Sequence, residues 1–77
     1  MIAALLTRID ADRNMARFYR VEALPDLFGG VQLIREWGRI GTGGQRLSHW
    51  CATASEAENL RDTLLAAKLR RGYALAG

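Results

Sequence analysis

The last third of the chain carries the pattern that most restricts the fold. Ser55-Glu56-Ala57-Glu58 has the form of a capping box, in which the Ser55 hydroxyl and the Glu58 carboxylate each accept a hydrogen bond from a free backbone N–H. Apolar residues then recur at intervals of three and four, which is the spacing of one helical face. They are Ala57, Leu60, Leu64 and Ala67. The pattern predicts one amphipathic helix that begins near Ser55.

The end of this helix is also marked in the sequence. Arg70 and Arg71 place positive charge where the helix macrodipole favours it. Gly72 follows and can adopt the left-handed conformation that ends many helices. We expect Tyr73 to fold back onto the last turn.

The residues before the helix indicate strands and turns. Aromatic and β-branched residues favour strands, and the polar or glycine-rich segments between them favour turns. The expected strands cover residues 2–9, 18–24, 31–40 and 45–53. Because the strands come as a run before the helix, we expect an α+β fold, with an antiparallel sheet of three to five strands and one C-terminal helix packed against it. A length of 77 residues suits a single domain over residues 1–77.

Strand alternation assigns side chains of the segment 31–40 to two faces. One face carries Val31, Leu33, Arg35, Trp37 and Arg39. This face begins apolar and ends basic and aromatic. If it is buried at Trp37, carboxylates must cover the arginines, because a buried unpaired charge is costly. If it is open, it forms a basic aromatic platform. Trp50 and Phe18 are expected in the core.

The triplet Trp37-Gly38-Arg39 has the chemistry of a binding site. Tryptophan stacks on bases, at about 1–3 kcal/mol per base. The guanidinium of Arg39 can bind phosphate through two hydrogen bonds, and Gly38 lets another backbone approach closely. The alternative is structural, since a tryptophan in a strand more often belongs to the core.

The charge balance gives only weak direction. The chain has 11 Lys and Arg residues against 8 Asp and Glu, a net charge of +3 and a pI near 9.8. All but one of the basic residues are arginine, the preferred cation for planar phosphate contacts. A solvated surface explains this charge as well as a polyanion site does. On the predicted helix, Arg61, Lys68, Arg70 and Arg71 are more typical of solvated surface than of a site.

Metal binding and catalysis find little support. His49 and Cys51 point to one side of a strand, but no other His or Cys completes a zinc site. Nothing supplies the oxyanion hole that Cys-His catalysis needs. The run Gly41-Thr42-Gly43-Gly44 has neither the Walker A spacing nor the dinucleotide-binding spacing, and a hairpin turn explains it better. We expect a non-enzymatic domain without a metal or a cofactor.

The single cysteine, Cys51, excludes an intrachain disulfide and suits a reducing compartment. The first six residues are apolar but too short for a membrane span, and they lack the basic start of a signal peptide. The expected location is the cytoplasm, with no membrane partner.

The ordered set of motifs resembles the WGR domain family, named for its Trp-Gly-Arg motif. The motif itself is Arg35-Glu36-Trp37-Gly38-Arg39-Ile40-Gly41. Residues 17–21 are similar to the aromatic strand of the family, and residues 26–30 resemble the turn of many bacterial members. Residues 55–73 are similar to the closing helix. The resemblance covers most of the chain and gives the motif the context that three residues alone lack.

The resemblance implies a sheet with one helix, and a binding function. Family members inside poly(ADP-ribose) polymerases bind DNA beside a break, and relay that state to a catalytic domain. Carried over, Trp37 would stack on the terminal nucleotide and Arg39 would contact phosphate or a neighbouring domain. Asn14 resembles an asparagine near the 5′ phosphate in some members. This sequence shows no catalytic, regulatory or zinc-finger domain, so we expect that any relay acts on a separate protein or does not exist.

The sequence therefore predicts a small nucleic-acid-binding module that prefers DNA near ends or nicks. The expected contacts are Trp37, Gly38, Arg39, Arg35, Arg46 and Asn14. The alternative is a protein-interaction or regulatory module that uses the same Trp37 face without nucleic acid. A protein partner in trans and a homodimer both remain open.

Overall fold

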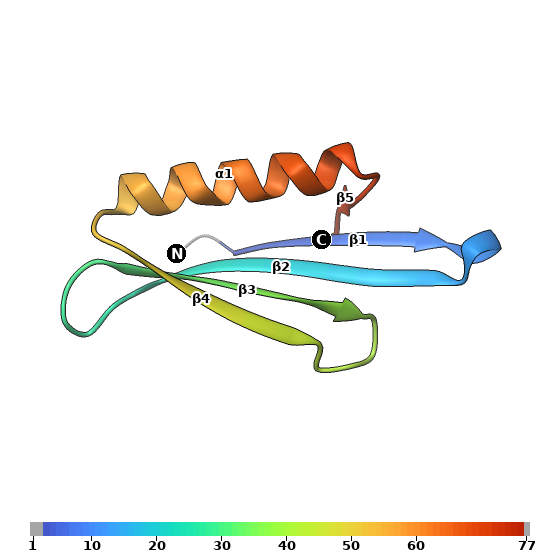
Figure 1. The fold of residues 1–77 in the computed structure, drawn as a ribbon, viewed down its shortest axis with the longest axis horizontal. Helices are drawn as coiled ribbons and strands as arrows, with labels where there is room; N and C mark the ends of the chain where they lie inside the picture. Colours follow the sequence, from blue (N-terminus) through green and yellow to red (C-terminus); the bar gives the residue numbers. More distant parts are fainter. Residues whose placement is uncertain (1–2, 77) are drawn as a thin grey trace.

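A computed structural model describes residues 3–76 as a five-stranded antiparallel sheet with one helix along one face (Figure 1). The order of the strands across the sheet is β4-β3-β2-β1-β5. The long elements are β1 (Ala3–Asp10), β2 (Met15–Pro25), β3 (Val31–Arg39), β4 (Gln45–Cys51) and α1 (Ala54–Arg70). A short 3-10 helix, Ala11–Arg13, joins β1 to β2, and the two-residue β5 (Ala74–Leu75) follows α1. The predicted α+β class is confirmed.

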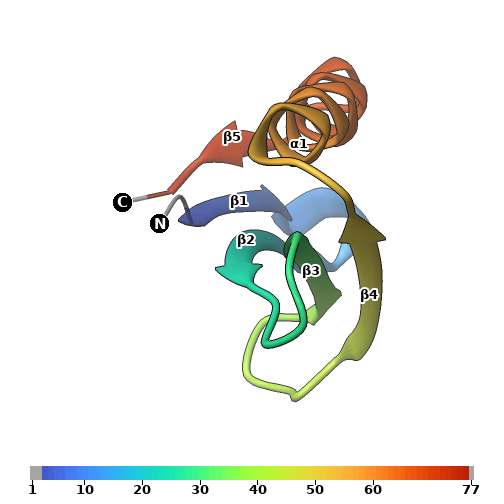
Figure 2. The same cartoon turned by 90° about the vertical axis from the view of Figure 1, so that its left-hand side faces the viewer.

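The core lies between α1 and the face of the sheet that α1 covers (Figure 2). Its buried members come from β1, β2, β3, β4, α1 and the segment after α1. They are Leu6, Tyr19, Val21, Leu33, Cys51, Ala57 and Tyr73. Leu60, Leu64 and Leu65 of α1 pack against them. The predicted apolar stripe of the helix therefore faces the sheet at its first three positions, and Ala67 lies half-buried further along.

The helix cap lies two residues earlier than predicted. Thr53, not Ser55, is the N-cap: its Oγ1 accepts a hydrogen bond from the Glu56 N–H at 3.1 Å. In return, Glu56 Oε2 accepts from the backbone N–H of Ala52 at 2.9 Å. Thr53 keeps the extended backbone of a capping residue, whereas Ser55 already lies inside the helix. The sequence contains two overlapping cap patterns, and the end of β4 at Cys51 selects the first.

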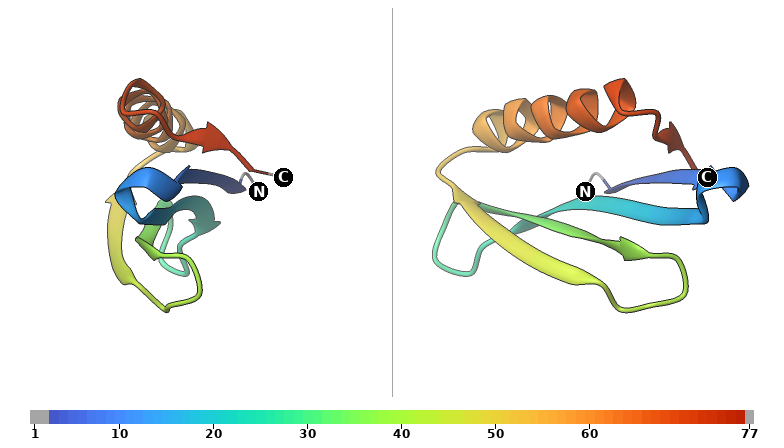
Figure 3. Two further views of the ribbon diagram at one scale, coloured as in Figure 1. Left: turned by 90° about the vertical axis from the view of Figure 1, so that its right-hand side faces the viewer. Right: turned by 45° about the vertical axis from the view of Figure 1, so that its right-hand side comes forward.

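The end of the helix follows the prediction. Gly72 has a φ of +92°, and its N–H donates to the Leu69 carbonyl at 3.1 Å. The N–H of Tyr73 donates to the Lys68 carbonyl at 3.1 Å, which completes a Schellman motif. The turn directs Tyr73 into the core and leads the chain to β5, which pairs with β1 (Figure 3). The sequence did not predict β5, because only the docking on β1 makes this short segment a strand.

The prediction that Trp50 and Phe18 belong to the core is wrong. Trp50 is 59% exposed, and Phe18 is half-buried outside the core cluster. In the sheet register, Trp50 lies opposite Gln32 and Phe18 opposite Gly38. Both therefore point to the face that α1 does not cover. Aromatic character indicated burial, but only the position of the helix determines which face is buried.

Two glycines bring β3 and β4 close together beside Trp37. A Cβ placed on Gly38 would lie 2.7 Å from Gly44 Cα. A Cβ placed on Gly44 would overlap the Trp37 carbonyl oxygen and lie 3.0 Å from the Phe18 ring, and Gly44 has a φ of +67°. The predicted close backbone approach at Gly38 is therefore made by the chain's own hairpin.

No helix among residues 3–76 is long and apolar enough to cross a membrane.

Substituting Gly44 tests whether this close approach holds the hairpin. We expect Gly44→Ala to lower the free energy of unfolding by about 2 kcal/mol or more, because the methyl group meets backbone atoms and the residue needs a positive φ. Gly43→Ala is the matched control, since nothing lies within 4 Å of its added Cβ, and should change stability by no more than about 0.5 kcal/mol. Urea denaturation gives both values, and equal losses would contradict the account.

Candidate functional site

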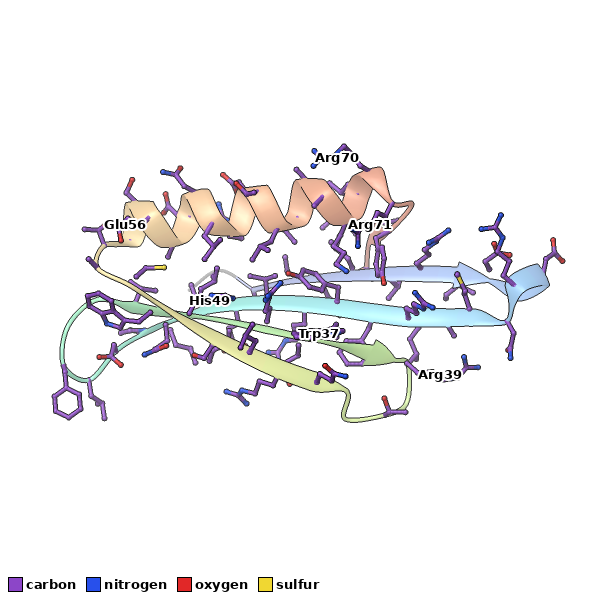
Figure 4. All side chains as sticks on the ribbon, in the orientation of Figure 1. Trp37, Arg39, His49, Glu56, Arg70 and Arg71 are labelled. Atoms are coloured by element: carbon purple, nitrogen blue, oxygen red, sulfur yellow. The ribbon has the colours of Figure 1, made fainter. Side chains whose placement is uncertain are left out.

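Trp37 lies at the edge of the core, neither fully buried nor fully exposed. Its side chain is half-buried and packs against the core cluster, opposite Tyr19 on β2. The guanidinium of Arg35 lies over its ring, with Cζ 5.3 Å from the ring centroid. Both side chains are on the helix-covered face, and Trp37 lies towards the end of the sheet where α1 ends (Figure 4). An aromatic surface thus continues from the core to the solvent.

Arg39 is held at the same end of the sheet by Asn14. Its Nη1 donates to the Asn14 backbone carbonyl at 3.2 Å, and its Nη2 lies 3.5 Å from Asn14 Oδ1. Asn14 has a φ of +50°, which asparagine tolerates better than most residues, and it ends the short 3-10 helix. The two predicted residues therefore lie together, and Arg39 is exposed.

Strand register adds two further arginines to this face. Arg17 lies opposite Arg39 on one side and opposite Arg8 on the other. The Arg8 side chain comes within 3.5 Å of a Cβ placed on Gly72, so it lies against the end of α1. Three adjacent strands thus place arginines in one row across the sheet.

Lys68 of α1 adds a cation on the helix-covered face, over Tyr19 of β2. Its Nζ lies 4.9 Å from the ring centroid of Tyr19 and 5.2 Å from that of Tyr73. Partial burial lowers the pKa of Lys68 below its usual value, and the charges of Arg71, Arg35 and Arg17 lower it further. Arg71, Arg35 and Arg17 therefore lie close enough to Lys68 for their charges to act on it.

We call this group the basic cluster; it comprises Arg8, Arg17, Arg35, Arg39, Lys68 and Arg71. Within residues 3–76, no ion pair involves any of its members. The carboxylates that form ion pairs do so with other arginines: Arg13, Arg20 and Arg61. The Nε of Arg35 is buried and has no hydrogen-bond partner in the described protein. Six unneutralised cations around three aromatic rings form a surface suited to a polyanion.

Two predicted contacts lie elsewhere. Arg46 is opposite Glu36 in the register and points to the helix-free face, away from Trp37. Gly38 is on that face too and is occupied by the hairpin packing described above. The structure instead places Arg8, Arg17, Lys68 and Arg71 on the side of the sheet with Trp37, and the sequence did not predict these residues as contacts. Arg17 could have been found from the sequence, because it is two residues from Tyr19 in the same strand and so shares its face. The position of the end of α1 above β2 could not.

His49 and Cys51 do point to one side of β4, as expected, and Cys51 is buried in the core. Among residues 3–76, no three His, Cys, Asp or Glu side chains come together as metal ligands.

Comparison with known proteins gives the family. The WGR domain model matches residues 2–77. An uncharacterized protein, y4dW of Sinorhizobium fredii, is 47% identical over 66 residues, which are 86% of this chain and 32% of that protein. A crystal structure of a Bacteroides fragilis protein superposes with a TM-score of 0.82 at 24% identity, over 99% of this chain and 20% of that one. This chain thus spans about a third and a fifth of these two proteins. The match to the family model, over a fold and a motif that agree with it, shows that the chain belongs to the WGR domain family.

Proposed function

We propose that the chain binds nucleic acid, and DNA near ends or nicks in preference, through the basic cluster and Trp37. WGR domains of poly(ADP-ribose) polymerases are nucleic-acid-binding modules, and the proposal extends this role to the present chain. The observation that carries it is the gathering of six cations, none of them in an ion pair within residues 3–76, around Tyr19, Tyr73 and the half-exposed Trp37.

Each part of the surface has a role in this proposal. Arg17, Arg39 and Arg71 are exposed and contact phosphates. The exposed part of Trp37 stacks on a base or sugar, and a strand end or a nick presents such a face without the cost of opening the duplex. Asn14 orients Arg39 through the hydrogen bonds described above. Since these contacts reach phosphate and ring faces, binding does not depend on base sequence.

The direct test is a titration of the protein with labelled oligonucleotides at several salt concentrations. Nicked 5′-phosphorylated duplex, blunt duplex, single-stranded DNA and RNA are compared. We expect measurable affinity at low salt, a steep loss as salt rises, and a preference for nicked or ended duplex. Absence of binding to every nucleic acid at low salt would favour the alternative, a protein-interaction module that uses the same Trp37 face.

Substituting single arginines tests which face binds. We expect Arg17→Ala to weaken binding and to reduce the slope of log K against log salt by about 1, as the loss of one phosphate contact does. Arg46→Ala is the matched control, because Arg46 is also an exposed strand arginine but lies on the helix-free face. Fluorescence anisotropy gives both slopes. If Arg46→Ala reduced the slope and Arg17→Ala did not, the binding face proposed here would be wrong.

The pKa of Lys68 reports on the cluster directly. In the free protein, burial and the neighbouring arginines lower this pKa. A bound phosphate favours the protonated amine, so we expect the pKa to rise on binding and the affinity to fall as pH rises through the window between the free and bound values. Lys68 is the only lysine in the sequence, so its ε-CH2 NMR signal is unambiguous. If the pKa of Lys68 stays unchanged on saturation with DNA, Lys68 is not part of the binding surface.

A further inference from the structure

The loop between β2 and β3 exposes two large apolar side chains almost completely. Leu27 is 94% exposed and Phe28 is 96% exposed. Trp50 of β4, 59% exposed, reaches the same loop: its indole N–H donates to the Gly29 carbonyl at 3.1 Å. We call Leu27, Phe28 and Trp50 the tip patch. Single exposed apolar residues are common on protein surfaces, but three large ones together at one end indicate an interaction site.

The loop that carries the patch is well braced. Asp26 accepts hydrogen bonds from the Phe28 N–H and from Gln32 Nε2, both at 3.1 Å. The Asp26 N–H donates to the Gly30 carbonyl at 3.1 Å, which closes the loop. Any Cβ on Gly30 would lie 2.9 Å from the Trp50 ring, so the indole packs tightly on the backbone there. Because these hydrogen bonds fix the loop backbone, a partner that covers the patch would have to order only the side chains of Leu27 and Phe28.

Charge distribution indicates how two copies can meet. The protein is 45 Å long, and the β2–β3 loop is at one end while the end of α1 and the β1–β2 turn are at the other (Figure 1). The basic cluster belongs to the second end. Two copies that meet through their tip patches therefore keep their basic clusters as far apart as the molecule allows. Any contact through the basic ends would instead bring like charges together.

From this arrangement, we infer that the tip patch is a homodimer interface, in which Leu27, Phe28 and Trp50 pack against the same residues of a second copy about a two-fold axis. A two-fold contact pairs a surface with itself, and apolar side chains can pack against copies of themselves without a group of opposite charge. The dimer would present one basic cluster at each far end. This inference does not depend on the proposed nucleic-acid binding.

The patch is small for a stable dimer interface. An aromatic side chain buries about 150–250 Å². The three exposed side chains together amount to roughly 400–500 Å² per copy, or about 800–1,000 Å² for the pair, which is below the ~1,200–2,000 Å² of stable interfaces. We therefore expect a reversible, concentration-dependent dimer rather than a permanent one.

Sedimentation equilibrium between about 10 μM and 1 mM tests this inference, because a weak, reversible dimer dissociates in this range of concentration. We expect a monomer–dimer equilibrium for the wild type that tightens as salt screens the net positive charge. Phe28→Ser should weaken the dimer at least tenfold. Ile9→Ser is the matched control. Ile9 is 71% exposed and lies beside the β1–β2 turn, at the end of the molecule away from the tip patch, so this variant should leave the Kd unchanged. Thermal melting checks that both variants remain folded.

A third variant tests whether the dimer needs the ordered loop as well as the three apolar side chains. Asp26→Ala keeps all three apolar side chains but removes the hydrogen bonds that brace the loop, so we expect an intermediate loss of affinity. A wild type that remains monomeric up to 1 mM would overturn the inference. So would a dimer that Phe28→Ser leaves intact, or a monomer that binds zwitterionic lipid vesicles through the patch instead of a second copy.

Discussion

The register between β2 and β3 is the constraint on which the rest of the molecule depends. Nine consecutive residue pairs, from Arg17–Arg39 to Pro25–Val31, fix which side chains of the two central strands share a face. A shift of one residue would move Tyr19, Val21 and Leu33 out of the core. It would also separate Trp37 from the core and disperse the arginines. The same register that builds the core therefore builds the basic cluster.

The basic cluster carries an energetic cost in the isolated protein. Among residues 3–76, its six cations form no ion pair with a carboxylate and repel one another. Partial burial lowers the pKa of Lys68, and the charges of Arg71, Arg35 and Arg17 lower it further. The aromatic rings of Tyr19, Tyr73 and Trp37 offset part of this cost through cation–π contacts. A polyanion would remove the rest, so its binding should stabilise the folded domain. The packing around Tyr19 and Tyr73 thus links stability to the proposed function.

Local sequence patterns predicted the parts that local interactions determine. The apolar stripe of α1, the left-handed Gly72 and the shared face of Arg35, Trp37 and Arg39 followed from helical and strand periodicity. The helix start was two residues out, because Thr53 and Ser55 each begin a cap pattern and the end of β4 chooses between them. These errors and successes concern residues that are near each other in the sequence.

Long-range packing determined what the sequence did not predict. Trp50 and Phe18 were assigned to the core on their aromatic character, and the helix covers the other face. Lys68 and Arg71 were taken for solvated helix surface, because nothing local shows that the last turn of α1 lies above Arg17 and Tyr19. Asn14, chosen from the family resemblance, lies beside Arg39, while Arg46 lies on the opposite side of the sheet.

The central claim is that one face of this WGR domain, defined by the basic cluster and Trp37, binds nucleic acid. The most direct measurement is an NMR titration of isotope-labelled protein with nicked duplex, which reports every backbone amide and both indole N–H groups. The account predicts shifts at the Trp37 indole and along residues 14–17, 35–39 and 68–73, with the Trp50 indole and Arg46 unaffected. Shifts that centre on Arg46 and the helix-free face, or no shifts at saturating DNA, would contradict it.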